Sequence, residues 1–346
     1  LTAVSDNIYL TRASNVISMT YDLRGRKITM DDPDMGQWAY RYNAFGELVW
    51  QRDAKGQIVT MAYDKLGRLV SRNEVEGIST WEYDTASDGI GKLAKAYNPA
   101  SGHLRALKYD SVGRLSAETS SIDSESFTVA YTYDGSSRPE TIVYPTGFVV
   151  RNLYNRHGYL FEVRNAANDS SYWKATASDP EGRIVSETLG NGLETVRAFD
   201  PANGSIKAIS TGIGTGSGVQ HLEYLLDALG NLKQRKDLRA TNSHVENFTY
   251  DSLNRLETAT IVNVGVRAYQ YDLAGLGNIR SKSDFGDRYI YGDNGAGPHA
   301  VTSVESGGVA VATYTYDANG NMTGGDGRSI DWTSFNKAET ITKGSA

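Results

Sequence analysis

One short phrase recurs along the chain and constrains its fold more than any other feature. It reads YDKLGR at 63–68, with close copies YDLRGR at 21–26 and YDSVGR at 109–114. Looser copies follow at intervals of mostly 20–27 residues, and the first three copies begin 21 residues apart. A phrase that returns at such a period is typical of a repeat protein, which is built by adding equivalent units.

About fifteen copies stand in register, usually with Gly three positions after an Asp or Asn. They occupy 21–26, 42–47, 63–68, 83–92, 97–103, 109–114, 133–138, 154–159, 178–183, 199–204, 226–231, 250–255, 271–278, 291–297 and 316–321, with a truncated copy at 335–337. We therefore expect residues 1–346 to form a single continuous repeat array.

Each unit predicts a β-hairpin. Before the turn, apolar and polar residues alternate, as at Val59, Met61 and Tyr63, which indicates a half-buried strand. At the turn, Asp or Asn accepts a hydrogen bond from a backbone N–H two residues on, and Gly supplies a left-handed conformation. A four- or five-residue loop built on a type I turn fits these residues. Return strands are then expected at RLVSR (68–72), RLSAE (114–118), RIVSE (183–187) and RLETA (255–259).

The turn motif supplies the candidate site residues. In the clearest copies we assign Asp as the turn acceptor, Gly as the left-handed hinge, Arg as a neighbouring cation and Tyr as a contact within the sheet. These structural residues are Tyr21, Asp22, Gly25, Arg26, Tyr63, Asp64, Gly67, Arg68, Tyr109, Asp110, Gly113, Arg114, Tyr250, Asp251, Tyr316, Asp317 and Gly320.

Two interpretations of these residues compete. Asp64 with Arg68 is either an acid–cation catalytic pair or a turn cap beside a weak, exposed ion pair. A motif present about fifteen times is a poor match for a single active site, so the turn-cap interpretation is favoured. The tyrosines fit either a carbohydrate-stacking surface or cross-strand aromatic packing, which contributes roughly 0.2–1 kcal/mol per pair. Packing is the favoured interpretation.

Composition argues against several classes of protein. The chain has 35 Lys+Arg against 41 Asp+Glu, which argues against a nucleic acid or an anionic membrane held by bulk charge. It has no cysteine, which excludes disulfides and cysteine zinc sites. No apolar run approaches the roughly 18 residues of a transmembrane helix, and the first residues show no signal peptide. The 22 Tyr and 36 Gly suit many short strands and tight turns.

Candidate chemical sites outside the repeat lack the required pattern. Residues 317–328, DANGNMTGGDGR, partly match a calcium loop, but Arg328 stands where a bidentate Glu belongs, so we interpret them as a glycine-rich turn. GIGTGSG at 212–218 does not follow the dinucleotide-binding pattern and is expected to be a long, flexible hairpin connection. The histidines never form HxH or HExxH, and they are His103, His157, His221, His244 and His299. We therefore expect no catalytic residue, no cofactor and no metal.

Some thirty short strands in series also predict an architecture. Twist accumulates along a sheet, and open sheets beyond about ten strands curl or split. An array in which each hairpin contacts its sequence neighbours can curl as a spiral, and a wide spiral has an interior that its own side chains do not fill. We expect an all-β, curved wall around a hollow, with plugs or further repeats covering its open strand edges.

The phrases YDLRGR, YDKLGR, YDSVGR, YDSLNR and YDANGNMTGGDGRSIDWTSFNK resemble the RHS/YD-repeat family. This family includes the bacterial Rhs polymorphic toxins, the C component of Tc insecticidal toxins, wall-associated YD-repeat proteins and the YD shell of teneurins. The resemblance covers essentially the whole chain. It implies a hollow β-cocoon wound from hairpins, which in the toxins encloses a C-terminal effector in an unfolded or inactive state until delivery.

The resemblance also implies a function and partners. It favours a non-enzymatic shell segment of a secreted or surface-associated bacterial toxin. Its partners would be an encapsulated effector, further repeats or plug domains, and a secretion or Tc-type delivery apparatus. One alternative is an extracellular module that binds glycans or proteins; a more distant one is a glycan-active enzyme with a carboxylate pair across two turns.

The family's toxins end in a segment rich in Asp-Pro and Gly that cleaves the chain. Nothing after 335–337 matches that segment, so we expect no separate toxin or cleavage domain in this sequence. The dipeptides Asp32-Pro33, Asp179-Pro180 and Asp200-Pro201 lie within ordinary repeats, so no cleavage role is expected for them.

Overall fold

The computed structural model describes residues 3–5, 16–214, 216–239, 244–272 and 276–344. Apart from one 3-10 turn, η1 (Asp293–Gly295), every regular element in these ranges is a β-strand. The strands are β1 (Ala3–Ser5), β2 (Val16–Tyr21), β3 (Lys27–Asp32), β4 (Gly36–Tyr42), β5 (Leu48–Arg52), β6 (Ile58–Tyr63), β7 (Leu69–Glu74), β8 (Gly77–Tyr83), β9 (Leu93–Asn98), β10 (His103–Tyr109), β11 (Leu115–Ile122), β12 (Glu125–Tyr133), β13 (Pro139–Val143), β14 (Val149–Tyr154), β15 (Leu160–Asn165), β16 (Ser171–Ser178), β17 (Ile184–Leu189), β18 (Leu193–Phe199), β19 (Ile206–Ile213), β20 (Gln220–Leu226), β21 (Leu232–Asp237), β22 (His244–Tyr250), β23 (Leu256–Ile261), β24 (Gly265–Tyr271), β25 (Ile279–Lys282), β26 (Arg288–Tyr291), β27 (Val301–Ser306), β28 (Val309–Tyr316), β29 (Met322–Gly325), β30 (Arg328–Trp332) and β31 (Ala338–Lys343).

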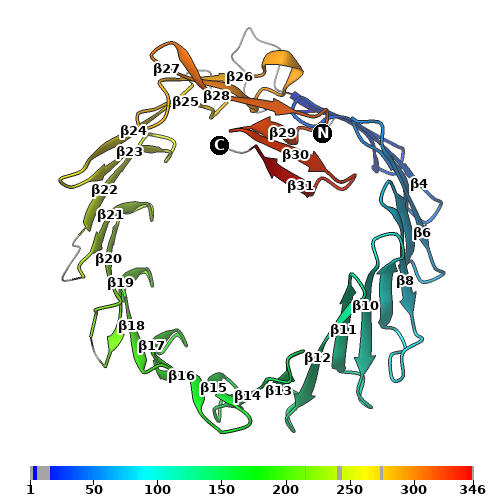
Figure 1. Ribbon diagram of the computed structural model, residues 1–346, viewed down its shortest axis with the longest axis vertical. Coiled ribbons are helices and arrows are strands. Elements are labelled where there is room, and N and C mark those ends of the chain that lie inside the picture. Colours follow the sequence, from blue (N-terminus) through cyan, green and yellow to red (C-terminus); the bar gives the residue numbers. More distant parts are fainter. Residues whose placement is uncertain (1–2, 6–15, 215, 240–243, 273–275, 345–346) are drawn as a thin grey trace. The chain divides into compact units, whose positions relative to one another are not determined.

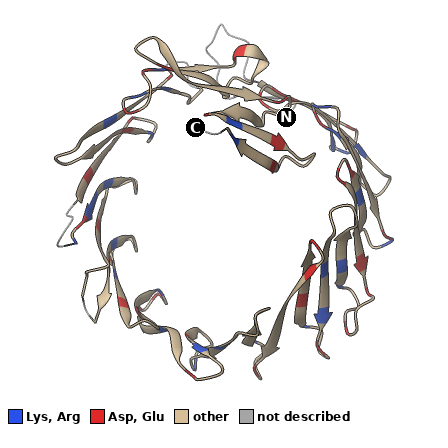
Figure 2. Ribbon diagram, in the orientation of Figure 1, with Lys and Arg blue, Asp and Glu red and all other residues tan. Residues whose placement is uncertain are grey.

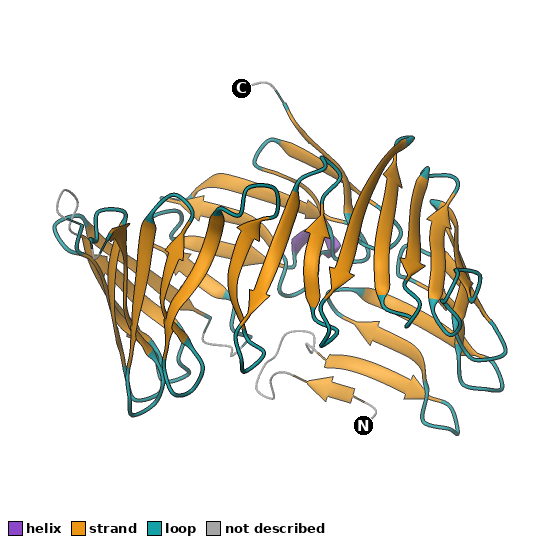
Figure 3. Ribbon diagram, turned by 90° about the horizontal axis from the view of Figure 1, so that it is seen from below, coloured by secondary structure: helices purple, strands orange, loops and turns teal. Residues whose placement is uncertain are grey.

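The strands pair in chain order. Each pairs antiparallel with the next from β1 to β10. The same holds from β12 to β23, for β24 with β25, and from β26 to β31. Figure 3 shows the strands side by side with turns at both ends. The predicted all-β array of serial hairpins is confirmed.

The chain divides into two compact units. Unit 1 comprises Leu1–Leu107, Ser120–Ser126 and Ala268–Ala346, so it joins hairpins from the two ends of the sequence. Unit 2 comprises Lys108–Thr119 and Phe127–Arg267. Within unit 1, β26 to β31 form a six-stranded sheet of their own.

Strand β6 shows why these sequences form strands. Val59, Met61 and Tyr63 are buried or half-buried, whereas Thr60 and Ala62 between them are exposed. This alternation matches the period of two side chains in a strand, and it was the pattern expected from the sequence. The predicted return strands also form, each beginning one residue after the Arg of its turn.

Few side chains are fully buried. Among the described residues the buried apolar ones are Val59, Ala94, Val150 and Val304, whereas ten buried residues are polar or charged. Figure 2 shows acidic and basic residues interspersed along the hairpins. Backbone ladders and polar contacts at the turns therefore carry much of the organisation, and the turns are where a functional site has to be sought.

Candidate functional site

The YD turn has one repeated geometry. At 63–68 the Asp64 N–H donates to the Arg68 carbonyl and the Gly67 N–H donates to the Asp64 carbonyl, at 3.0 and 3.1 Å. The Asp64 carboxylate accepts the N–H groups of Leu66 and Arg68 at 2.8 and 3.0 Å, and its second oxygen accepts Nε of Arg68 at 2.7 Å. Equivalent backbone bonds tie Asp22 to Arg26, Asp110 to Arg114, Asp251 to Arg255 and Asp317 to Asn321. Each Asp thus organises its own turn.

The Asp–Arg pair is less exposed than the sequence suggested. The side chains of Arg68 and Asp64 are only 22% and 23% exposed. Arg68 also donates from both terminal nitrogens to the Asp84 carboxylate, at 3.1 and 2.6 Å. Its guanidinium is therefore satisfied by two carboxylates of neighbouring turns, which is a structural role.

The motif tyrosines join one hairpin to the next. Tyr63 donates its hydroxyl to the Leu48 carbonyl at 2.9 Å, and Tyr250 does so to Leu232 and Tyr316 to Val301. At four other turns the motif ring lies under the guanidinium of the preceding turn, a contact that stabilises neighbouring units. These stacked pairs are Arg26 over Tyr42, Arg68 over Tyr83, Arg114 over Tyr133 and Arg138 over Tyr154, at 4.3–4.9 Å. These four rings thus pack against Arg, whereas the ring pairs found among the described residues involve other aromatic side chains.

Glycine is not essential at the fourth turn position. Gly25, Gly67, Gly113 and Gly320 have φ between 76° and 81° there. Ser137 and Asn254 occupy the same position with φ of 63° and 60°. An L-residue in this region costs roughly 1–2 kcal/mol, with Asn tolerated better than most.

This predicts a graded response at Gly25, where an added Cβ would meet no atom within 4 Å. Gly25→Ala should lower the free energy of unfolding by about 1–2 kcal/mol, because only the backbone conformation is penalised. Gly25→Asn should cost less. Urea denaturation of both variants measures the difference, and equal stability of all three chains would contradict it.

The turn carboxyls titrate below their ordinary values. The Arg26 guanidinium, followed by the Arg26 N–H, lowers the pKa of Asp22. At Asp64 the Arg68 N–H is the largest cause, and it outweighs the rise in pKa from partial burial. A carboxyl whose pKa is lower in the folded chain than in the unfolded chain stabilises the fold at pH values above its unfolded pKa, which is near 3.8 for these residues. This stabilisation is lost as the pH falls through the pKa of the folded chain.

We therefore expect stability to be nearly constant from pH 7 down to pH ~5 and to fall steeply below pH ~4. Circular dichroism during an acid titration measures this. A main loss of structure between pH 5 and 7 would contradict the assignment to turn aspartates.

A second kind of turn connects one YD hairpin to the next. We call these the linking turns, and the first three lie at 32–36, 53–57 and 74–77. Position 13 after each motif tyrosine falls within them, and there the chain carries Asp34, Lys55 and Glu76 in turn. Buried polar residues concentrate here and at the turns that contact them, namely Asp32, Asp53, Glu74, Asn319, Thr333 and Ser334.

The three linking turns contact three YD-type turns from the other end of the sequence. We call this contact, within unit 1, the seam. Its second side comprises the turns 292–300, 317–321 and 333–337 of the β26–β31 sheet. The paired residues are 258–266 positions apart in sequence. Figure 1 shows these strands in orange and red beside the blue hairpins.

Each linking turn has its own partner in the seam. The His299 N–H donates to Asp34 at 3.0 Å, and the His299 ring nitrogen Nδ1 lies 2.5 Å from the other Asp34 oxygen. Lys55 pairs with Asp317 at 3.3 Å. The Ser334 N–H and hydroxyl both donate to the Glu76 carboxylate at 2.5 Å. Burial raises the pKa of Glu76, but the two Ser334 hydrogen bonds, together with the Glu76 N–H and the Arg72 charge, hold the pKa below its ordinary value.

Asn319 lies at the centre of the seam and is 4% exposed. Its Nδ2 donates to the buried Asp53 carboxylate at 2.7 Å and to Asn336 at 3.1 Å. Its carbonyl oxygen accepts the Lys55 N–H at 3.2 Å. One amide thus satisfies groups from both sides of the seam.

Backbone approaches backbone closely at the seam. A Cβ added to Gly297 would lie 2.3 Å from an Asp34 carboxylate oxygen and 2.5 Å from the Asp34 Cα. A Cβ on Gly320 would lie 2.5 Å from the Asp34 carbonyl oxygen, and one on Gly36 would lie 2.9 Å from the Ala318 carbonyl oxygen. The two sides therefore fit each other only with glycine at these positions.

The structure corrects two sequence interpretations. Residues 317–328 are not one glycine-rich turn, because Met322–Gly325 form strand β29, paired with β28 and β30. The truncated copy at 335–337 is a complete turn shifted in register. Thr333 takes the place of Asp, Asn336 that of Gly with φ of 56°, and Trp332 that of Tyr, donating its indole N–H to the Met322 carbonyl.

Other candidate sites are weaker. Among the described residues no group of three His, Asp or Glu side chains could hold a metal ion, and none of the described segments forms a helix able to span a membrane. The connection at 212–218 joins β19 to β20, although residue 215 lies outside the described part.

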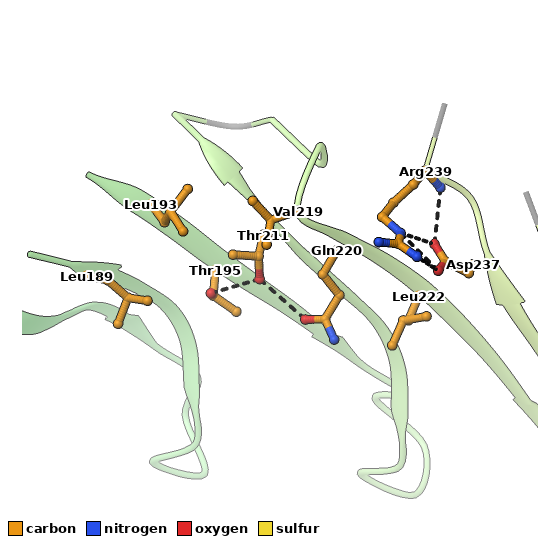
Figure 4. A pocket seen from close by; sticks show the side chains of 9 residues that line it. All are labelled: Leu189, Leu193, Thr195, Thr211, Val219, Gln220, Leu222, Asp237 and Arg239. Atoms are coloured by element: carbon orange, nitrogen blue, oxygen red, sulfur yellow. Dashed lines mark hydrogen bonds and ion pairs between the residues drawn. The ribbon is translucent and has the colours of Figure 1, made fainter. Parts of the chain in front are cut away.

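A cavity of about 540 Å³ opens on unit 2 (Figure 4). Its polar groups already pair with one another: Thr195 with Thr211, Thr211 with Gln220, and Asp237 with Arg239. Apolar side chains form the remaining lining, namely Leu189, Leu193, Val219 and Leu222. The cavity shows no group poised for chemistry.

Two known proteins are similar to this chain in sequence. No family model matches the sequence. Teneurin-4 of Mus musculus is 26% identical over 206 residues, which is 55% of this chain and 7% of that protein. The probable deoxyribonuclease RhsA of Dickeya dadantii is 26% identical over 223 residues, which is 64% of this chain and 13% of that protein. The chain thus spans a small part of these relatives' length.

Solved structures share the fold. TcdB2-TccC3 without its hypervariable C-terminal region matches with a TM-score of 0.78 and 18% identity, covering 95% of this chain and 19% of that one. The Photorhabdus luminescens Tc holotoxin pore matches with a TM-score of 0.76 and 17% identity, over the same shares. Serial hairpins closed by YD turns define the class of YD-repeat arrays. The resemblance to the RHS/YD-repeat family is thus supported by the similarity to Teneurin-4 and RhsA in sequence and to the Tc toxin structures in fold.

Proposed function

We propose that this chain is a wall segment of a toxin shell that confines an effector until delivery. The observation that carries the proposal is the seam, in which one edge of the hairpin array contacts the opposite edge 258–266 residues later. An array whose edges stack on each other can extend as a continuous wall. The fold likeness to TcdB2-TccC3 over 95% of the chain supports it.

The YD turns add a second line of support. The residue two positions after the turn Asp or Asn is an exposed apolar side chain in five copies, with 67–90% exposure. These residues are Phe45, Leu66, Val112, Leu229 and Leu253. At the seam the equivalent residue, Asn319, is covered by a linking turn. Exposed apolar turn residues of this kind, within each unit, fit a wall in which successive layers cover each other.

The proposed role is structural. The wall would deny proteases access to the effector and deny the effector room to fold. Further repeats or plug domains would close the shell, and a secretion or Tc-type apparatus would deliver it from a bacterium. The name of RhsA denotes a probable deoxyribonuclease, and this chain spans 13% of that protein.

Limited proteolysis of the natural full-length protein tests the proposal. We expect an effector that resists protease while the wall is folded and is degraded after Glu76→Ala with Ser334→Ala, which removes one seam contact. An effector that is cleaved while the repeats remain intact would refute confinement.

A glycan-binding module is the second candidate, favoured by one aromatic cluster in unit 2. Tyr144, Phe148 and Tyr172 are each 40% exposed, and the ring centroid of Phe148 lies 5.9 Å from that of Tyr144 and 5.6 Å from that of Tyr172. A glycan array with the chain and its Tyr144→Ala, Phe148→Ala variant distinguishes the candidates. Binding by the unchanged chain that the variant abolishes would favour a glycan-binding module. If the unchanged chain binds no glycan, the shell wall is the remaining candidate.

A further inference from the structure

The two sides of the seam are each repetitive, so several alignments between them are geometrically available. One hairpin step moves a linking turn by 21 residues, from Asp34 to Lys55 to Glu76. Equivalent backbone turns would then meet in a shifted alignment as well. Repeats of this kind need a specific feature that fixes their register, as strands do when their side-chain pattern is uniform.

The side chains at these equivalent positions differ in charge. The linking turns carry acid, base, acid at Asp34, Lys55 and Glu76. Their partners are His299, Asp317 and Ser334, in that order. Each linking side chain therefore meets a group that it attracts.

A shift by one hairpin in either direction would break this match. Asp317 would leave Lys55 and face Glu76 after one shift, or Asp34 after the other. The Asp317 and Lys55 side chains are only 13% and 27% exposed, so water screens such a contact poorly. Juxtaposed like charges at an interface cost several kcal/mol and suppress the wrong alignment.

We propose that the alternating charges at Asp34, Lys55 and Glu76 select the register of the seam. They do so because Asp317 is attracted by Lys55 and repelled by the two carboxylates. Hydrogen bonds to Asn319 and Ser334 then stabilise the selected alignment. The charges thereby determine which hairpin of the returning chain stacks on which, and so how many hairpins separate the two edges. This holds whether or not the wall encloses an effector.

Exchanging two charges tests the proposal without altering the YD turns. Lys55→Glu with Glu76→Lys keeps the net charge and moves the single base by one linking turn. In the shifted alignment Asp317 would again face a lysine and His299 would face a glutamate. The altered chain should therefore prefer a seam displaced by one hairpin.

The chain has no cysteine, so introduced cysteines report the register cleanly. Val75→Cys with Phe335→Cys flanks the Glu76–Ser334 contact and reports the observed alignment. Ala100→Cys with Phe335→Cys reports the shifted one. Ala100 lies between β9 and β10 in the next linking turn, so the YD copy that the sequence suggested at 97–103 is not a YD turn. Each pair is treated with a short bis-maleimide in the unchanged chain, in the charge-exchanged chain and in a control. The control is Lys95→Glu with Glu82→Lys, which exchanges an exposed cross-strand pair outside the seam.

In the unchanged and control chains we expect cross-linking through the 75–335 pair alone. In the charge-exchanged chain we expect that yield to fall at least about tenfold and the 100–335 yield to rise. A like-charge contact that costs several kcal/mol changes the ratio of the two alignments by more than about tenfold. Undiminished 75–335 cross-linking would overturn the proposal. Loss of both cross-links in a chain that retains its β circular dichroism would also overturn it, since the charges would then hold the seam without selecting its register.

Discussion

Replacing Gly297 by alanine is expected to open the seam while the hairpins remain folded. The added Cβ would lie 2.3 and 2.5 Å from side-chain and backbone atoms of Asp34. Backbone cannot move aside as a flexible side chain does, and overpacking of this kind costs about 1–3 kcal/mol. The penalty falls on the contact between two turns rather than on any hairpin ladder.

Limited proteolysis at 292–300 and denaturant unfolding measure this effect. Gly135→Ala is the matched control, because a Cβ there meets no atom within 4 Å and, like Gly297, it shows no left-handed φ. Faster cleavage in Gly297→Ala but not in Gly135→Ala is the expected result. Equal cleavage of the two variants would mean that the turns do not approach as closely as described.

Replacing Asn319 by alanine should destabilise unit 1 by about 2–4 kcal/mol. The change leaves the buried Asp53 carboxylate without its 2.7 Å donor and the Lys55 N–H without its acceptor. A buried polar group that loses its partner costs about 1–3 kcal/mol, and a charged one costs more. Asn319 is the only residue among the seam contacts described above that bonds to two groups of the linking turns and to Asn336.

Ser136→Ala provides the comparison for Asn319→Ala. Ser136 occupies the same position of another YD turn, two residues after its Asp, and it is exposed. Its side chain can be removed without touching a seam contact, so we expect little change. Urea unfolding should separate the two variants clearly, and similar losses of stability would place the effect in the turn rather than in the seam.

The local part of the fold could be predicted from the sequence. Asp64, Gly67 and the alternation through Val59 and Met61 all act within a few residues of each other. Hydrogen bonds two and four residues along the chain satisfy the carboxylate, and the left-handed turn needs no partner beyond the hairpin. Such features are determined by residues close together in sequence, and each repeat unit shows them again.

The seam could not be predicted in the same way. Asp34, Lys55 and Glu76 were visible at 21-residue spacing, but their partners lie 258–266 residues further on. Which turn meets which depends on twist summed over many strands, and no local pattern specifies that sum. Asn319 falls in the stretch that partly matches a calcium loop, and nothing in that pattern indicates a contact with Asp53. The turn at Thr333–Lys337 does not follow the YD pattern, because Trp332, Thr333 and Asn336 replace Tyr, Asp and Gly.

Amide hydrogen exchange at three N–H groups tests the central claim most directly. The N–H groups of Lys55, His299 and Ser334 lie in turns, where exchange is ordinarily fast, and each donates across the seam. The account predicts that all three are protected in the unchanged chain and that Gly297→Ala exposes them together. Exchange as fast in the unchanged chain as at Gly135, an exposed residue of another YD turn, would contradict the seam, and with it the stacking on which the proposed wall depends.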